Sequence, residues 1–284
     1  MKIGKYKIYE ITTGRFALDG GAMYGVVPKT IWEKSDTPDT KNRLKLVTRN
    51  LLLVSDSRKI LIDTGLGTKW EEKYREIYQI DQTEDHLENG LKNLGFSYDD
   101  ITDVLLTHLH FDHTGGSTRL VDGKIEPTFK YANYYVQKDN FEWALNPTEK
   151  DRASYLIENF EVLAKEGMLR LLDEKTEKLD DEISVLRVHG HTRGQQIFKI
   201  ADSSNSILFG GDLFPTKHQI ALAYVMSYDL QPLITLQEKK FVLANCLEEA
   251  TTVYLEHDYR HAALTLKDSE KGIIVSEVYN ALPE

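Results

Sequence analysis

Residues 103–113 read Asp-Val-Leu-Leu-Thr-His-Leu-His-Phe-Asp-His, an apolar run that ends in a cluster of metal-ligand residues. The cluster contains His108, His110, Asp112 and His113. In a turn that follows a strand, side chains at positions i, i+2, i+4 and i+5 can converge on a small volume, and imidazole nitrogen with carboxylate oxygen is a ligand set typical of Zn²⁺. Only nine histidines occur in 284 residues, so three within six positions indicate a metal site. Four ligands of this kind indicate more than one ion.

Further polar groups follow other strand-like segments of the chain. Gly190-His191-Thr192-Arg193-Gly194 comes after the apolar run 183–188, Gly210-Gly211-Asp212 comes after 206–209, and Glu256-His257-Asp258 comes after 252–255. In layered α/β folds the ligand sites collect at the carboxyl ends of the strands. We therefore expect these groups to belong to one site with the cluster at 108–113.

In this order and separation the motifs resemble those of the metallo-β-lactamase superfamily of dinuclear hydrolases. His-x-His-x-Asp-His, Gly-His-Thr-x-Gly, Gly-Gly-Asp and a late Glu-His-Asp are all present, and Asp63-Thr64-Gly65 matches an early turn of that superfamily. The resemblance implies an α/β fold, a four-layer αβ/βα sandwich in which two mixed β-sheets are flanked by helices. It also implies a single domain over residues 1–284.

The resemblance also implies a ligand set, residue by residue. The first ion is held by His108, His110 and His191, the second by Asp112, His113 and His257, and both by Asp212. Zinc is the expected ion, and iron, manganese and cobalt fit the same nitrogen and oxygen ligands.

Three other polar residues need separate interpretation. His189 lies two residues before His191 and competes with it, but the superfamily pattern has its ligand between glycine and threonine, which favours His191. Asp63 is expected to orient a ligand rather than to bind metal. His86 lies on a charged stretch and is expected at the surface.

Such a site would perform hydrolysis without a serine or cysteine nucleophile. Two neighbouring divalent ions lower the pKa of a shared water from about 15.7 toward about 7, so that a bridging hydroxide is available at neutral pH. Asp112 is the expected catalytic residue, because a carboxylate with one oxygen on the metal can exchange a proton through the other.

Composition and charge restrict the partners. A chain with 41% hydrophobic residues and no Pro/Ser-rich linker fits one large globular domain, and its single cysteine, Cys246, is expected to be buried in a helix. No signal peptide or membrane-spanning segment is evident, which predicts a cytoplasmic protein without membrane contact. A net charge of −10 without a basic cluster disfavours nucleic acid as a partner.

Periodicity and turn residues predict the coarse secondary structure. Strands are expected at 5–11, 51–55, 59–62, 103–107, 134–137, 168–172, 183–188, 197–200, 206–209 and 252–255. Helices are expected at 69–79, 84–94, 150–165 and 232–250.

Two apolar segments are candidates for the substrate-binding surface. Residues 18–29 are glycine-rich and resemble the N-terminal loop of the branch that contains N-acyl-homoserine lactone lactonases and methyl-parathion-hydrolase-like enzymes, where this loop borders the active-site mouth or a homodimer contact. An apolar wall for the acyl or aryl group of a small-molecule substrate is expected from this segment and from 220–228. Its candidate residues are Met23, Tyr24, Val26, Trp32, Tyr224 and Tyr228. Packing of the first segment on the core of its own domain is the alternative.

The chain departs from the lactonase pattern at one point. Lactonases of the best-known branch carry a tyrosine shortly after the bridging aspartate, whereas Leu213, Phe214 and Pro215 follow Asp212 here. Tyr224 or Tyr228 could substitute. The preferred function is opening of lactone rings, as in quorum quenching, and the alternative is hydrolysis of aryl esters or organophosphate triesters.

Two further classes stay open. One is a metal-containing effector that binds a small ligand and turns it over slowly. The other is a di-iron oxygen or nitric oxide reductase, which needs a flavin module. Only 27 residues follow His257, too few for such a module within this sequence.

Overall fold

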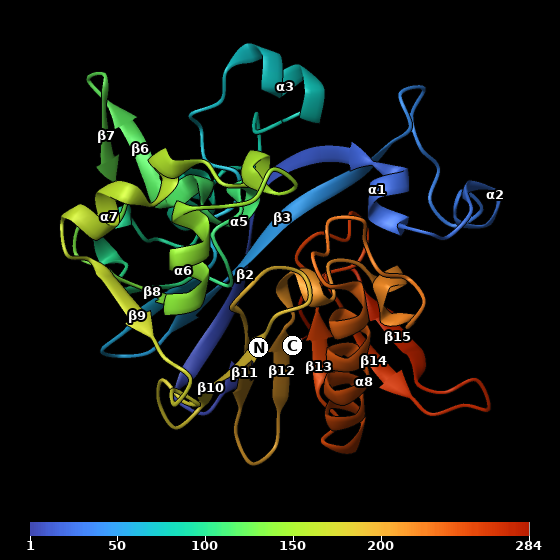
Figure 1. Ribbon diagram of the computed structural model, residues 1–284. Coiled ribbons are helices and arrows are strands. Elements are labelled where there is room, and N and C mark those ends of the chain that lie inside the picture. The colour runs from blue at the N-terminus through green and yellow to red at the C-terminus, as the bar shows by residue number, and fades with distance from the viewer. Residues whose placement is uncertain (284) are drawn as a thin grey trace. The chain divides into compact units, whose positions relative to one another are not determined.

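The computed structural model describes residues 1–283, and its backbone divides into two compact units. The first unit comprises Met1–Arg15 and Thr48–Thr176, and the second comprises Phe16–Val47 and Glu177–Glu284. Each unit contains a mixed β-sheet with helices packed against it (Figure 1). The predicted class of mixed sheets flanked by helices is confirmed, and the expectation of a single domain stays a prediction.

The larger sheet has seven strands. In spatial order they are β1 (Lys2–Ile3), β2 (Tyr6–Asp19), β3 (Arg43–Val54), β4 (Lys59–Ile62), β5 (Asp103–Leu105), β8 (Asn133–Gln137) and β9 (Leu169–Leu172). They lie in the first unit except for residues 16–19 of β2 and 43–47 of β3. β4, β5, β8 and β9 pair in parallel, and the strand predicted to end at Thr107 ends at Leu105. Val104 and Leu105 are fully buried, as expected for a parallel strand covered on both faces. Parallel pairing places the carboxyl ends of β4 and β5 at one edge, so Asp63 and the histidine cluster share that edge.

The helices of the first unit are mostly short. They are α3 (Glu72–Tyr78), α4 (Leu87–Asn93), α5 (Phe111–Thr114), α6 (Lys138–Leu145) and α7 (Glu161–Lys165), with 3₁₀ turns at η1 (Tyr98–Asp100), η2 (Gly115–Ser117), η3 (Arg152–Ser154) and η4 (Ile157–Asn159). A hairpin of β6 (Thr118–Val121) and β7 (Lys124–Pro127) forms a separate small sheet. α6 packs on β8 and β9, as Figure 1 shows.

The helix predicted at 150–165 is wrong. Only its last turn, α7, is α-helical, and η3 and η4 precede it. The Asp151 carboxylate accepts hydrogen bonds from the Thr148 backbone and hydroxyl and, at 2.7 Å, from Nε1 of Trp143. Such local side-chain bonding competes with the helical backbone pattern, which explains why the chain turns here instead of continuing a helix.

The sheet of the second unit has six strands. They are, in spatial order, β10 (Ile183–Val188), β11 (Gln195–Ala201), β12 (Ser206–Phe209), β13 (Thr252–Tyr254), β14 (Ala263–Lys267) and β15 (Ile274–Tyr279). β11 is antiparallel to β10 and to β12, and β12 is parallel to β13, so β10, β12 and β13 run in one direction. Their carboxyl ends therefore meet at one edge of the sheet, and His191, Asp212 and His257 each follow one of these ends.

The helices of the second unit include one long element. α8 (Pro232–Glu248) lies along β14 and begins with the proline expected near its first turn (Figure 1). The others are α1 (Gly20–Tyr24), α2 (Lys29–Trp32), η5 (Gly211–Leu213) and η6 (Lys217–Ile220). Cys246 is buried in α8, as predicted. Over residues 1–283, none of the helices combines the length and the apolar character that crossing a membrane requires.

The segment 18–29, expected to be a loop, is partly regular. β2 continues to Asp19, whose side chain caps α1 by accepting a hydrogen bond from Ala22 N at 2.9 Å. An aspartate at this position satisfies a helical amide that would otherwise lack an acceptor, which explains why a helix starts directly after the strand.

Candidate metal centre

The histidine cluster of the first unit forms a compact group after β5. His108 and His110 lie in the loop, and Asp112 and His113 lie in α5. All four side chains are buried. The ring of His108 lies 4.0 Å from that of His113 and 4.4 Å from that of His110, measured between centroids. The strand, its loop and one helical turn thus hold the four residues of the predicted motif together.

Asp63 orients this cluster through hydrogen bonds. Its Oδ1 accepts from Thr107 N at 2.7 Å, and its Oδ2 accepts from the Thr107 hydroxyl at 2.6 Å and lies 2.9 Å from Nδ1 of His113. Because the Thr107 hydroxyl donates its hydrogen bond to Asp63, its oxygen can accept a hydrogen bond from Nδ1–H of His108 at 3.1 Å. Both imidazoles then carry their proton on Nδ1 and have Nε2 available as a metal ligand.

The backbone at Asp63 supports this role. Its φ of 55° lies in the left-handed region, which aspartate tolerates better than most residues. Gly65 has a φ of 68°, and a Cβ there would lie 2.0 Å from Oγ1 of Thr13. The turn that directs Asp63 to the cluster therefore requires glycine two residues later.

In the second unit, Asp212 lies between two histidines. Its Oδ2 is 3.2 Å from Nε2 of His191, and its Oδ1 is 3.2 Å from Nε2 of His257. The far nitrogen of each ring is also engaged, since Nδ1 of His191 lies 2.8 Å from Oδ1 of Asp229 and Nδ1 of His257 lies 2.9 Å from the Val47 carbonyl.

This arrangement tests whether a metal fits. A carbonyl oxygen can only accept a hydrogen bond, so Nδ1 of His257 carries the proton and its Nε2 presents a lone pair to Asp212. Asp229 favours the same tautomer at His191. Two imidazole lone pairs and a carboxylate would repel one another across 3.2 Å unless a positive charge lies between them. The donor set fits a divalent cation.

His189 has a structural role. Its Nδ1 accepts a hydrogen bond from Gly194 N at 3.2 Å, and the backbone amides of His189 and Gly190 donate to the two carboxylate oxygens of Glu238. Burial raises the pKa of Glu238. The turn that carries His191 is thus held by its own side chains and by α8.

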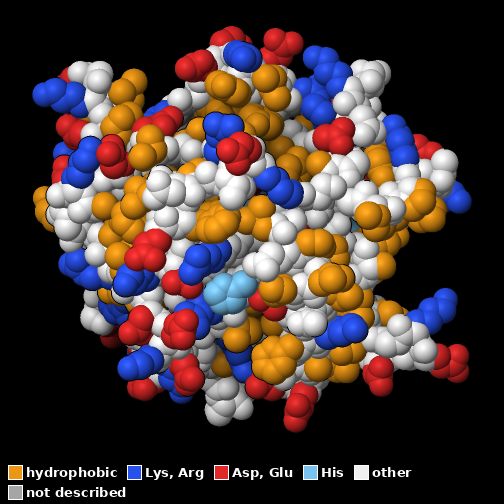
Figure 2. Space-filling view, viewed as in Figure 1, with side chains coloured by type: hydrophobic (Ala, Val, Ile, Leu, Met, Phe, Trp, Pro, Cys, Tyr) orange, Lys and Arg blue, Asp and Glu red, His pale blue; other side chains and the backbone are white. Residues whose placement is uncertain are grey.

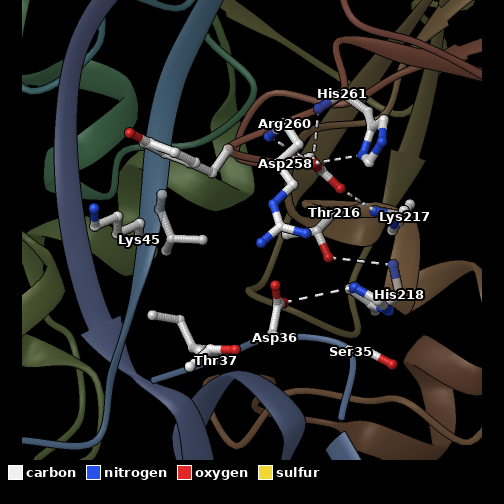
Figure 3. A pocket seen from close by; sticks show the side chains of 13 residues that line it. Ser35, Asp36, Thr37, Lys45, Thr216, Lys217, His218, Asp258, Arg260 and His261 are labelled. Atoms are coloured by element: carbon white, nitrogen blue, oxygen red, sulfur yellow. Dashed lines mark hydrogen bonds and ion pairs between the residues drawn. The ribbon is translucent and has the colours of Figure 1, made fainter. Parts of the chain in front are cut away.

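Asp258, next to His257, anchors the loop around a pocket of about 230 Å³ in the second unit. Figure 3 shows its carboxylate, which accepts hydrogen bonds from the backbone amides of Lys217, Arg260 and His261 at 2.9–3.0 Å. These amides hold the pKa of Asp258 below its usual range, against the effect of burial. Asp258 therefore ties the chain after Asp212 to the turn that carries His257.

His218 and Asp36 face each other across the same pocket. Nε2 of His218 lies 3.6 Å from Oδ2 of Asp36 (Figure 3). The same Asp36 oxygen accepts a hydrogen bond from the Tyr24 hydroxyl at 2.8 Å. Burial lowers the pKa of His218 and the nearby Asp36 opposes this shift.

The six candidate substrate residues all lie in the second unit, and they differ in exposure. Tyr24 stacks on Trp32 with centroids 5.1 Å apart, and the Tyr224 ring meets Tyr24 edge-on at 5.6 Å. Met23 and Trp32 are buried, whereas Val26 is 93% exposed. Tyr224 and Tyr228 are half-buried. Their roles in substrate binding stay predictions.

An aromatic cluster beside the metal-ligand loop was not predicted. Phe111, directly before Asp112, has ring contacts of 5.2 Å with Trp70 and 5.3 Å with Tyr78. Burial, followed by the charge of Asp112, raises the pKa of Tyr78. Tyr155 meets the His110 ring at 4.7 Å. Only the position of Phe111 inside the motif signalled this cluster.

With this geometry established, comparison with known proteins identifies the family. A model described as the Metallo-beta-lactamase superfamily matches residues 46–265. The chain belongs to this superfamily. The predicted family is therefore confirmed.

Relatives within the superfamily include two kinds of hydrolase. The N-acyl homoserine lactonase AiiA of Bacillus thuringiensis subsp. kurstaki is 28% identical over 228 residues, covering 74% of this chain and 77% of that protein. The acyl-coenzyme A thioesterase MBLAC2 of Homo sapiens is 28% identical over 172 residues, covering 58% of this chain and 57% of that protein. A crystal structure of a probable metal-dependent hydrolase from Staphylococcus aureus is 27% identical, with a TM-score of 0.90 over 100% of both chains. The prediction of a metal-dependent hydrolase is confirmed.

Proposed function

We propose that the protein is a dinuclear metal-dependent hydrolase that opens lactone rings, with N-acyl-homoserine lactones as the substrate class. The position of Asp212 is the main support for two metal ions, because each of its two carboxylate oxygens lies 3.2 Å from Nε2 of a histidine. This is the geometry expected of a carboxylate that would bind two ions, one through each oxygen, with one of the two histidines on each ion. The lactonase relative from Bacillus thuringiensis supports the substrate class.

We assign the ligands as the superfamily pattern implies. His108, His110 and His191 hold one ion, Asp112, His113 and His257 hold the other, and Asp212 binds both. The hydrogen bonds to Nδ1 of His108, His113, His191 and His257 support this assignment, because each keeps Nε2 in its metal-binding form. Zinc is the proposed ion, since it prefers nitrogen and oxygen ligands of this kind.

When bound, two such ions supply an acidified water and polarise the carbonyl oxygen of the substrate. The chain itself supplies proton transfer. Asp112 is the proposed catalytic residue, because its buried carboxylate accepts the proton of the attacking water and returns it to the leaving alcohol oxygen. Returning the proton completes ring opening, since an alkoxide is a poor leaving group at neutral pH.

We further propose Tyr78 as the hydrogen-bond donor to the substrate carbonyl. Its ring contacts Phe111, which precedes Asp112, and its half-buried phenol, whose pKa is raised by burial, keeps its proton at neutral pH. The segment after Asp212 has no tyrosine to donate a hydrogen bond to the substrate carbonyl, and we propose that Tyr78 supplies this donor instead. In the second unit, Tyr224 and Tyr228 are the alternatives for the same role.

An uncharged substrate suits the charge of the protein. The chain carries a net charge of −10, and on the face drawn in Figure 2 the Lys and Arg side chains are interspersed with Asp and Glu side chains. A neutral lactone with an acyl chain meets no long-range repulsion from such a surface. Aryl esters and phosphotriesters share this property, and we keep them as the alternative substrates of the same site.

The deciding experiment compares kcat/KM for N-acyl-homoserine lactones of increasing chain length, an aryl phosphotriester and an acyl-coenzyme A thioester. We expect the lactones to be preferred. Four added methylenes that are buried on binding should raise kcat/KM roughly 10²-fold, at about 0.8 kcal/mol each. Efficient phosphotriester or thioester cleavage without lactone turnover would reject the lactonase proposal while leaving the hydrolase intact. Metal content measured on the same preparation separates loss of metal from choice of substrate.

A further inference from the structure

The first unit contains a second cavity of about 480 Å³. This volume lies in the range of about 300–1,000 Å³ that is usual for small-molecule sites. Its lining comes from the segment 80–88, from η1, and from the β6–β7 hairpin. The proposed metal ligands are not among the residues that line it. Its closest connection to the metal-ligand loop is Gly116, three residues after His113.

Three polar side-chain atoms of this lining are buried and make no hydrogen bond within residues 1–283. They are Oε1 of Gln82, Nε of Arg119 and Oγ1 of Thr128. Thr128 is only 3% exposed. Buried polar groups almost always have a partner, so three such atoms around one cavity point to a ligand that supplies the partners.

The hydrogen-bonding roles of these atoms can be assigned. Nε2 of Gln82 donates to the Thr13 carbonyl at 3.2 Å, which fixes the amide so that Oε1 is an acceptor directed elsewhere. Nε–H of Arg119 is a donor, and its guanidinium lies over the Tyr98 ring at 5.4 Å from the centroid. The Thr128 hydroxyl can donate or accept. The cavity therefore offers one donor, one acceptor and one hydroxyl that can act as either.

The charged and apolar residues of the lining further restrict the chemical class of the ligand. Arg75 and Arg119 are balanced by Asp81 and Glu88 in the lining, so a polyanion such as a nucleotide is not favoured. Ile80 and Leu87 are buried, and together with the face of Tyr98 they provide an apolar wall.

We propose that this cavity binds a small monocarboxylic acid that has an amide N–H or hydroxyl group and an apolar chain. The carboxylate accepts hydrogen bonds from Nε of Arg119 and from the Thr128 hydroxyl. The amide or hydroxyl of the ligand donates to Oε1 of Gln82, and the chain lies against Ile80 and Leu87. This site is separate from the proposed hydrolytic centre, and the proposal does not depend on lactone turnover.

The test uses N-hexanoylglycine, which has all three features and no bond that a lactonase opens. We expect calorimetry on the metal-loaded protein to show saturable binding, and binding at this cavity should persist in the His191→Ala variant, because none of the proposed metal ligands line it. Thr128→Val, which is nearly isosteric, should lower the affinity for N-hexanoylglycine about fivefold. Arg119→Gln should lower this affinity roughly 10- to 100-fold. Neither variant should change the KM for a lactone when N-hexanoylglycine is absent.

Thr118→Val is the matched control, because Thr118 lines the same cavity but its hydroxyl already donates to the Glu158 carbonyl at 2.8 Å. Thr118→Val should lower the melting temperature, because this bond is lost, and should change the affinity for N-hexanoylglycine less than twofold. Thr128→Val should not lower the melting temperature, since no bond is lost. Three results would overturn the proposal: no binding of N-hexanoylglycine, equal weakening by the two threonine variants, or a destabilised Thr128→Val protein, which would mean that ordered water already satisfies this hydroxyl.

Discussion

The carboxylate of Asp229 lies 2.8 Å from Nδ1 of His191, and both side chains are about 2% exposed. This contact joins the turn after β10 to the segment that leads into α8. The backbone reinforces it, because Leu230 N donates to the His191 carbonyl at 3.0 Å. Asp229 therefore determines both the tautomer and the orientation of a proposed metal ligand, in the way that Asp63 does for His113 in the first unit.

Asp229→Asn should lower the affinity for the metal or the activity by roughly 10- to 100-fold without unfolding the protein. An asparagine keeps the size of the side chain but stabilises the required imidazole tautomer less well. Metal affinity is measured by competition with a chromogenic chelator, alongside kcat. Asp202→Asn, in a surface turn, is the control and should have no effect. Unchanged affinity and activity in Asp229→Asn would show that His191 needs no orienting carboxylate.

His191→Ala should lose metal and activity together, whereas His189→Ala should lose less. Nε2 of His191 faces Asp212, whereas Nδ1 of His189 accepts a hydrogen bond from Gly194 N. Elemental analysis of both purified variants distinguishes the two roles. A larger loss of metal in His189→Ala would reverse the assignment of the third ligand.

Local motifs made much of the site predictable. His108, His110, Asp112 and His113 lie within six residues, and their strand-and-turn context can be recognised without any tertiary contact. Strands such as 183–188 and 206–209 are apolar runs with clear turn residues on both sides, and they occur as predicted.

The remaining features depend on contacts between distant segments. Asp229 is 38 residues from His191 and lies in no recognisable pattern. β15 was missed because most of its residues are exposed, so no apolar alternation marks it. The Trp70–Tyr78–Phe111 cluster likewise joins Phe111 to residues 33 and 41 positions earlier in the sequence.

Tyr78→Phe tests the proposed carbonyl donor. Loss of one hydrogen bond to the substrate oxygen should lower kcat/KM about tenfold, which corresponds to ~1.4 kcal/mol, while the metal content stays unchanged. Tyr74→Phe is the matched control, because Tyr74 lies on the same helix and is 40% exposed. If Tyr224→Phe or Tyr228→Phe has the larger effect, the donor belongs to the second unit.

The stability of the protein should depend on pH through Lys239. Burial lowers the pKa of this ammonium to about 8, although its Nζ donates to the carbonyls of Ala221 and Tyr224 at 2.8 and 3.0 Å. In the unfolded chain the pKa is near 10.5, so between about pH 8 and 10.5 the unfolded state binds more protons. The free energy of unfolding therefore rises with pH across this window.

Urea unfolding at pH 7 and pH 10 checks this sign. From pH 7 to pH 10, wild type should gain about 2 kcal/mol relative to Lys239→Met. Lys240→Met, at the exposed neighbouring position, should show no such difference. A gap between wild type and Lys239→Met that does not change with pH would mean that the ammonium keeps its ordinary pKa in the folded state.

Asp112→Asn separates proton transfer from metal binding. The asparagine side chain would keep an oxygen of similar position but could not carry a proton, so kcat should fall roughly 10²-fold or more while KM changes little. The loss should be smaller for lactones or esters with acidic leaving groups, because these need less protonation as they depart.

Metal content must be measured on the same samples, since Asp112 is also a proposed ligand. A fall in kcat that follows the loss of one ion, and that excess metal restores, would assign Asp112 to metal binding alone. A fall that persists with two ions bound, and that depends on the leaving group, is the result expected of a proton carrier.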